Sequence, residues 1–255
     1  MKVTIISQND PFYTKAFFEE FIKVHDNADY SVTGVYFTSP MSDSLLQLIK
    51  RTHRFYGSKG FIKLGSKYAF TKLQEKMGRE VTAPVLLAGR GYSVDAVDDV
   101  NSPGFLEKIR TEAPDLVVSV SCPQIFKDEL LALPKLTCLN IHSGKLPTYR
   151  GLFPNFWQMK NGEQYSTVSI HEMTKKIDKG NLVLEEMVEI KPEYSLTDLI
   201  IETKREAAGA LDRVIKRYAL GDIEVFENHQ LKPGYFKFPG RKDVKEFREK
   251  GYRLT

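Results

Sequence analysis

The sequence is poor in cysteine: Cys122 and Cys138 are the only two in 255 residues. Two cysteines cannot build the disulfide framework on which many small secreted domains depend, and this pair lacks the spacing of a metal site. Both fall at the ends of expected strands. We therefore interpret them as buried free thiols of a cytoplasmic protein.

Long apolar runs are also missing. No stretch approaches the roughly 20 residues that cross a bilayer, and the first segment, residues 1–7, reads as a strand too short for a signal peptide. With 42% hydrophobic and 27% charged residues, the chain can bury one substantial core. We expect one domain over residues 1–230, a tail over 231–255, and no membrane association.

The formal net charge is only +4, but the basic residues are unevenly placed. Between Gln47 and Arg79 the only acidic residue is Glu75. The basic ones there are Lys50, Arg51, Arg54, Lys59, Lys63, Lys67, Lys72, Lys76 and Arg79. Such a segment suits the phosphates of a nucleotide, a nucleic acid or a membrane surface, and it equally suits a solvated helical face.

Strand-like and helix-like segments alternate along the first 150 residues. Expected strands cover residues 2–7, 30–37, 85–88, 115–121 and about 138–142, and helical patterns follow residue 10 and cover 42–55, 66–77, 103–112 and 125–133. This alternation predicts an α/β fold with a doubly wound, mostly parallel sheet. Two further strands at 166–173 and 181–190, a helix from a capping box at Ser195 to Gly221, and a last strand at 223–227 complete the expectation.

The chain is organised around residues 138–151. Asn140 and His142 have the same parity within the expected strand, so their side chains point to the same face. A loop containing Gly144, Pro147 and Gly151 follows, and ligands of open α/β sheets bind beyond the carboxyl ends of the strands. A lone histidine is more often part of a core. The loop, the helix start at 151–157 and a distal Asp-Lys-Gly turn favour a site.

Three motifs carry a resemblance to a known family. They are Asn140-x-His142, Leu146-Pro-x-x-Arg-Gly151 and Asp178-x-Gly180. Together they resemble the signature of the formyltransferases that use 10-formyltetrahydrofolate, a family with glycinamide ribonucleotide, methionyl-tRNA and sugar N-formyltransferases. The resemblance extends over about residues 115–190. It implies a Rossmann-like formyltransferase fold, transfer of a formyl group to an amine, and 10-formyltetrahydrofolate as co-substrate.

The resemblance also implies roles for single residues. Asn140 would donate a hydrogen bond to the developing oxyanion, and His142 would donate to it or move a proton from amine to leaving group. Asp178 would raise the pKa of His142 or hold a relaying water. Folate contacts would come from two segments, and their residues are Val120, Ser121, Cys122, His171, Met173 and Thr174.

The acceptor is harder to predict. Residues 143–147 depart from the Ser-Leu-Leu-Pro usual in the family, and residues 8–13 lack the Gly-rich phosphate loop of the ribonucleotide enzymes. The tRNA enzymes carry a C-terminal barrel, for which little sequence follows Glu227. We therefore expect a small amine, preferably an amino sugar nucleotide whose diphosphate meets the basic segment.

Three alternatives stay open. One is a methionyl-tRNA formyltransferase lacking the usual C-terminal domain, with nucleic acid as the less favoured partner. Another is a 10-formyltetrahydrofolate hydrolase, although such hydrolases usually carry an additional N-terminal domain. The last is a catalytically idle binding protein, which an intact Asn, His and Asp set disfavours.

Overall fold

The computed structural model describes residues 1–26, 28–39, 45–228 and 231–255. Within them, a seven-stranded sheet has the order β3-β2-β1-β4-β5-β7-β8. Its strands are β1 (Lys2–Gln8), β2 (Ser31–Thr38), β3 (Val94–Val97), β4 (Leu116–Val120), β5 (Thr137–His142), β7 (Tyr165–Glu172) and β8 (Leu182–Glu189).

The first five strands in chain order, β1 to β5, are parallel, whereas β7 and β8 are antiparallel to their neighbours. The predicted doubly wound, mostly parallel sheet is therefore confirmed. The carboxyl ends of β1, β4 and β5 lie beside one another at one edge of the sheet. Polar side chains that follow these three strands are consequently brought together.

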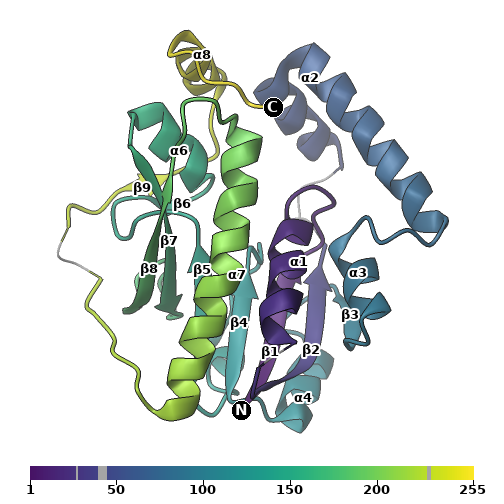
Figure 1. The fold of residues 1–255 in the computed structure, drawn as a ribbon, viewed down its shortest axis with the longest axis vertical. Coiled ribbons are helices and arrows are strands. Elements are labelled where there is room, and N and C mark those ends of the chain that lie inside the picture. The colour runs from purple at the N-terminus through teal and green to yellow at the C-terminus, as the bar shows by residue number, and fades with distance from the viewer. Residues whose placement is uncertain (27, 40–44, 229–230) are drawn as a thin grey trace.

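Helices cover both faces of the sheet (Figure 1). One face packs against α1 (Thr14–His25), α3 (Ala83–Gly89) and α7 (Leu196–Leu220), and the other against α4 (Pro103–Glu112) and α5 (Asp128–Leu131). Alternation along β1 supplies both cores, since Ile5 belongs to the first and Ile6 to the second. Each such fully buried side chain stabilises the fold by about 1.5–3 kcal/mol.

A third core lies at the end of the molecule to which the parallel strands point (Figure 1). It joins α2 (Leu45–Lys76), α6 (Pro154–Asn161) and α8 (Arg241–Glu249) through buried aromatic rings, among them Phe55, Phe156, Trp157 and Phe247. Beside it, β6 (Arg150–Gly151) pairs with β9 (Tyr235–Phe236). The residues after 230 thus pack closely on the domain.

Several expected elements were wrong. Residues 85–88 belong to the helix α3, and the third strand, β3, lies in the stretch expected to be a loop. The break expected at Gly57 is present as a kink with φ 72° within α2, but the helix after it covers residues 58–76 and so begins earlier than the expected 66. The helix expected at 125–133 shrinks to α5, and the strand at 223–227 to one bridge between Phe226 and Leu182. Residues 42–44 lie outside the described part.

Both cysteines are free thiols, Cys138 buried and Cys122 half-buried. Burial raises the pKa of the Cys138 thiol to about 12, which keeps it protonated and unreactive. In the described parts of the chain, no helix combines the length and the apolar character that crossing a membrane requires.

Candidate active site

Asn140 and His142 end β5, and both side chains point toward the loop that carries Asp178. Asn140 contacts His171, which faces Asp178, while His142 faces Asp178 directly. The prediction that the two side chains share one face of the sheet is therefore confirmed. The parallel β4, with β1 beyond it, ends on one side of this pair, and the antiparallel β7 runs along the other.

Asp178 lies between the two histidines. Its Oδ1 atom is 3.9 Å from His142 Nδ1 and 3.6 Å from His171 Nε2. Its Oδ2 atom accepts the N–H of Gly151 at 2.9 Å, and its carbonyl accepts the side-chain amide of Asn228 at 3.1 Å. With φ at 53°, Asp178 has a left-handed conformation that few residues other than glycine adopt. The surrounding contacts fix the carboxylate in place.

The charge state of Asp178 follows from these contacts. Burial alone would raise its pKa, but the neighbouring imidazoles of His171 and His142 and the Gly151 N–H lower the pKa to about 2. The carboxylate is therefore ionised throughout the neutral range. It forms a fixed negative charge beside both imidazoles.

His142 is prepared to accept a proton. Its Nε2 lies 2.7 Å from the carbonyl oxygen of Tyr149, which can only accept, so Nε2 carries the hydrogen. Burial lowers the pKa of His142 below its usual value, against the attraction of Asp178. The neutral ring then offers Nδ1 as the base. A proton taken there would face the carboxylate of Asp178.

His171 is a fourth member of this cluster. Register places it opposite Asn140 across β5 and β7, and its Nε2 is 3.1 Å from Asn140 Nδ2. Its Nδ1 donates to the carbonyl of Glu172 at 2.8 Å, so Nε2 accepts from the Asn140 amide. This contact orients Asn140 and uses one of its two amide hydrogens. The other remains for a ligand oxygen.

The residues expected to contact folate lie in different surroundings. Val120 is fully buried, so its side chain belongs to the core. Cys122 and Met173 are half-buried beside the second core, and Thr174 is exposed. Ser121 stands level with His142, because Val120 pairs with Ile141 one position earlier. His171 lies within the Asn140 cluster itself.

Close approaches of other atoms explain why positions 144 and 151 are glycines. A Cβ atom on Gly151 would lie 2.3 Å from the carbonyl oxygen of Phe236, and the residue has φ 97°. A Cβ atom on Gly144 would lie 2.9 Å from His142 Nε2. Only glycine lets the loop after β5 approach both the tail and His142.

Sequence reasoning missed two polar groups on the other side of β5. Lys204 of α7 is 7% exposed, and its ammonium donates a hydrogen bond to Ser121 Oγ. Asp10 follows β1, and its Oδ1 accepts the N–H groups of Phe12 and Tyr13 at 2.7 and 3.4 Å. Lys204 lies on the apolar stripe of the predicted helix. A charged residue at an apolar position of a helix is the sequence signal that could have identified Lys204 as a site residue.

The basic segment forms α2, which lies over the loop after β1. Lys67 packs on the ring of Phe12 at 5.5 Å from its centroid, and the hydroxyls of Tyr56 and Tyr13 are 3.3 Å apart. The segment therefore borders the edge of the sheet where Asn140 and His142 end. Its outer face, including Lys59 and Lys63, is exposed.

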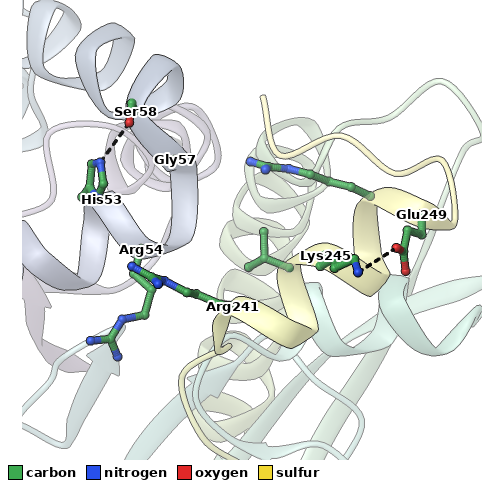
Figure 2. A pocket seen from close by; sticks show the side chains of 9 residues that line it. His53, Arg54, Gly57, Ser58, Arg241, Lys245 and Glu249 are labelled. Atoms are coloured by element: carbon green, nitrogen blue, oxygen red, sulfur yellow. Dashed lines mark hydrogen bonds and ion pairs between the residues drawn. The ribbon is translucent and has the colours of Figure 1, made fainter.

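A basic cavity of about 490 Å³ opens between α2 and α8 (Figure 2). Arg54 of α2 and Arg241 of α8 line it, and neither forms an ion pair with an acidic side chain among the described residues. The acidic side chain in its lining, Glu249, is 3.6 Å from Lys245. The full lining is His53, Arg54, Gly57, Ser58, Arg241, Val244, Lys245, Arg248 and Glu249. We call it the α2–α8 cavity.

Comparison with known proteins gives a consistent result. The sequence pattern of a family described as formyl transferase matches residues 80–215. A sugar N-formyltransferase from Shewanella sp. has a similar structure, with TM-score 0.58 and 20% identity over 92% of this chain and 76% of that one. A phosphoribosylglycinamide formyltransferase from Anaplasma phagocytophilum gives 0.60 and 14% over 92% and 96%.

A third similar structure bears on ligands. It is a sugar 3N-formyl transferase determined in the presence of dTDP and 5-N-formyl-THF, with TM-score 0.59 and 14% identity over 99% of this chain and 82% of that one. At these identities the structural matches establish the shared fold. The match to the family's sequence pattern spans more than half of the chain, and it therefore establishes family membership, which the structural matches alone do not.

Proposed function

Because the chain belongs to the formyl transferase family, we propose that it formylates the amine of a nucleotide-linked amino sugar. The protein is an N-formyltransferase whose co-substrate, 10-formyltetrahydrofolate, supplies the formyl carbon. The observation that carries the proposed chemistry is the Asn140, His142 and Asp178 cluster at the carboxyl edge of the sheet. The cluster offers a hydrogen-bond donor, a base and a fixed negative charge.

Each residue of the cluster meets one demand of formyl transfer. The free amide hydrogen of Asn140 donates to the formyl oxygen as negative charge develops there, a contribution of about 3–4 kcal/mol for such donors in other enzymes. His142 takes the proton of the attacking amine at Nδ1 and passes it to the departing nitrogen. Asp178 stabilises the imidazolium that forms between these two steps.

The residues beside this cluster suit the co-substrate. The half-buried Cys122 and Met173 would provide apolar contact, and the backbone at Ser121 and Thr174 would bind the pterin ring. Asn228 is buried next to Asp178, and its Oδ1 atom has no hydrogen-bond partner among the described residues, although its Nδ2 donates to the Asp178 carbonyl. A buried acceptor of this kind fits a ligand rich in N–H groups.

The nucleotide part of the proposal rests on the α2–α8 cavity. Arg54 and Arg241, which have no acidic partner in the described part of the chain, make a positive field that suits a diphosphate. A similar fold crystallised with dTDP supports the same class of acceptor. The free thiols Cys122 and Cys138 fit a reducing compartment, and we place the protein in the cytoplasm.

The test is to incubate the protein with 10-formyltetrahydrofolate and a panel of amines, following tetrahydrofolate release and product masses. We expect release that depends on a dTDP- or UDP-linked amino sugar and a product heavier by one formyl group. Formate release without amine would identify a hydrolase. Transfer to methionyl-tRNA alone would overturn the small-molecule acceptor, and folate binding without turnover would identify an idle binding protein.

A further inference from the structure

Lys204 is a buried cation that contacts no acidic side chain in the part of the chain that the structure describes. It is 7% exposed, and its ammonium donates to the neutral hydroxyl of Ser121. Within the described residues it forms no ion pair. Because burial removes the ammonium from water, the pKa of Lys204 falls to about 8, with only the more distant Asp10 opposing this. A buried lysine whose charged form is destabilised in this way is typical of a functional site.

Asp10 presents the complementary group. One carboxylate oxygen accepts two backbone N–H groups, from Phe12 and Tyr13. The other oxygen has no hydrogen-bond partner among the described residues. Asp10 and Lys204 attract each other electrostatically without being in ion-pair contact. Each group therefore keeps hydrogen-bonding capacity that the protein does not use.

The pair lies beside the reacting groups. Ser121 follows β4, the direct neighbour of β5 with its Asn140 and His142, and Asp10 follows β1, the next strand beyond β4. Lys204 is near enough to His142 for its charge to lower the pKa of that imidazole. Asp178 and His171 occupy the opposite side, along β7. An acceptor that enters from the β1 side would meet Asp10 and Lys204 before its amine reaches His142.

Ser121 supports this arrangement. It is a non-glycine residue with φ 57°, a conformation that costs about 1–3 kcal/mol and persists only where the surroundings impose it. Its hydroxyl is the hydrogen-bond partner that fixes the Lys204 ammonium. The strained end of β4 and the buried lysine therefore form one rigid unit.

We propose that Lys204 and Asp10 recognise two neighbouring hydroxyl groups on the sugar ring that carries the acceptor amine. A hydroxyl can donate to the free oxygen of Asp10 and accept from Lys204. The pair carries no net charge, so a phosphate would be repelled by Asp10 and a second ammonium by Lys204. Phosphates instead suit the α2–α8 cavity. The inference rests on the proposed function and specifies the sugar ring.

The experiment compares Lys204→Met and Asp10→Asn with the parent enzyme on dTDP-linked amino sugars and on analogues that lack one hydroxyl beside the amine. Both changes are expected to raise the acceptor KM roughly 10- to 100-fold, as for loss of a hydrogen bond to a charged group, with smaller changes in kcat and folate KM. The deoxy analogue should bind the parent enzyme weakly and be insensitive to the variant that faces the missing hydroxyl.

The matched control is Lys216→Met on the same helix, because Lys216 is half-exposed and paired with Asp212 at 2.8 Å. It is expected to leave all constants unchanged. If the parent enzyme turns over amino sugars but the variants keep their acceptor KM, or lose only kcat or folate affinity, this inference falls and the proposed function stands. If every amine panel fails while folate binds, the proposed function falls, and this inference with it.

Discussion

The polar groups on the two sides of β5 differ in how far the protein itself satisfies their hydrogen bonds. On the β7 side, Asp178 accepts the Gly151 N–H at Oδ2 and the Asn228 amide at its carbonyl, and its Oδ1 faces both imidazoles. On the β1 side, Asp10 uses one oxygen and Lys204 binds a single hydroxyl. The first side is organised before any ligand arrives, as electrostatic catalysis requires. The second retains unsatisfied capacity, as a recognition surface does.

The largest expected effect comes from the residues between the two sides. Replacing Asn140 or His142 by Ala should lower kcat by about 10²- to 10³-fold, because both serve charge that appears in the transition state. Folate affinity, measured by fluorescence titration, should stay within a few-fold of the parent. A variant that keeps its turnover, or that mainly loses folate binding, would contradict these roles.

Lys204→Met should increase the stability of the fold at pH 7 although it weakens acceptor binding. The pKa of Lys204 is lowered from 10.5 to about 8, so folding is penalised below pH 8 by about 3 kcal/mol. Because the unfolded chain binds the extra proton between pH 8 and 10.5, the parent should gain stability as pH rises through that window. Denaturant unfolding at several pH values checks this. The variant should be more stable at pH 7 and lack the rise.

Asp178→Asn should produce the opposite change in stability. The pKa of Asp178 is lowered from 3.8 to about 2, so its charge stabilises the fold by about 2 kcal/mol at pH 7. That contribution is present above pH 3.8 and is lost as pH falls toward 2. Asparagine tolerates the left-handed backbone, which isolates the charge.

The same change bears on the pH dependence of turnover. Because Asp178 raises the pKa of His142, its removal should move the acid limb of kcat to lower pH while kcat itself falls. A pH–rate profile of parent and variant measures both. An acid limb at unchanged pH would show that His142 does not sense this carboxylate.

The smallest effect is expected at the α2–α8 cavity. Replacing Arg54 and Arg241 by Ala should raise the acceptor KM roughly threefold to tenfold at low salt and flatten its salt dependence, with the folate KM unchanged. Replacing Lys59, Lys63 and Lys67 together should act in the same direction. Lys242→Ala is the control, since Lys242 is exposed and outside the cavity lining. Kinetics indifferent to both changes would make the segment a solvated face.

Periodicity and local chemistry predicted the sheet, its main helices and the common orientation of Asn140 and His142. They failed at residues 83–97, where a short apolar run formed α3 and the acidic stretch formed the edge strand β3. A short apolar run does not distinguish helix from strand, and an edge strand needs little hydrophobicity. Tertiary pairing with β2 decided the outcome.

Only some residues of the candidate site could be predicted, because long-range packing places the others. The parity of β5 is local, so the sequence could show that Asn140 and His142 share a face. The place of His171 depends on the antiparallel register between β5 and β7, and that of Lys204 on how α7 docks against β4. Register and docking are set by the whole core. No local pattern could assign His171 to the Asn140 cluster.

Gly151 joins parts of the chain that are distant in sequence. Its N–H holds Asp178, and its missing side chain makes room for the Phe236 carbonyl of the tail. A side chain here would displace the tail and the carboxylate at once, and no compensating change in either one alone would restore both. In evolutionary terms, the loop, the acid and the tail are expected to be inherited together, so that grafting the tail of a relative onto this domain requires its loop as well.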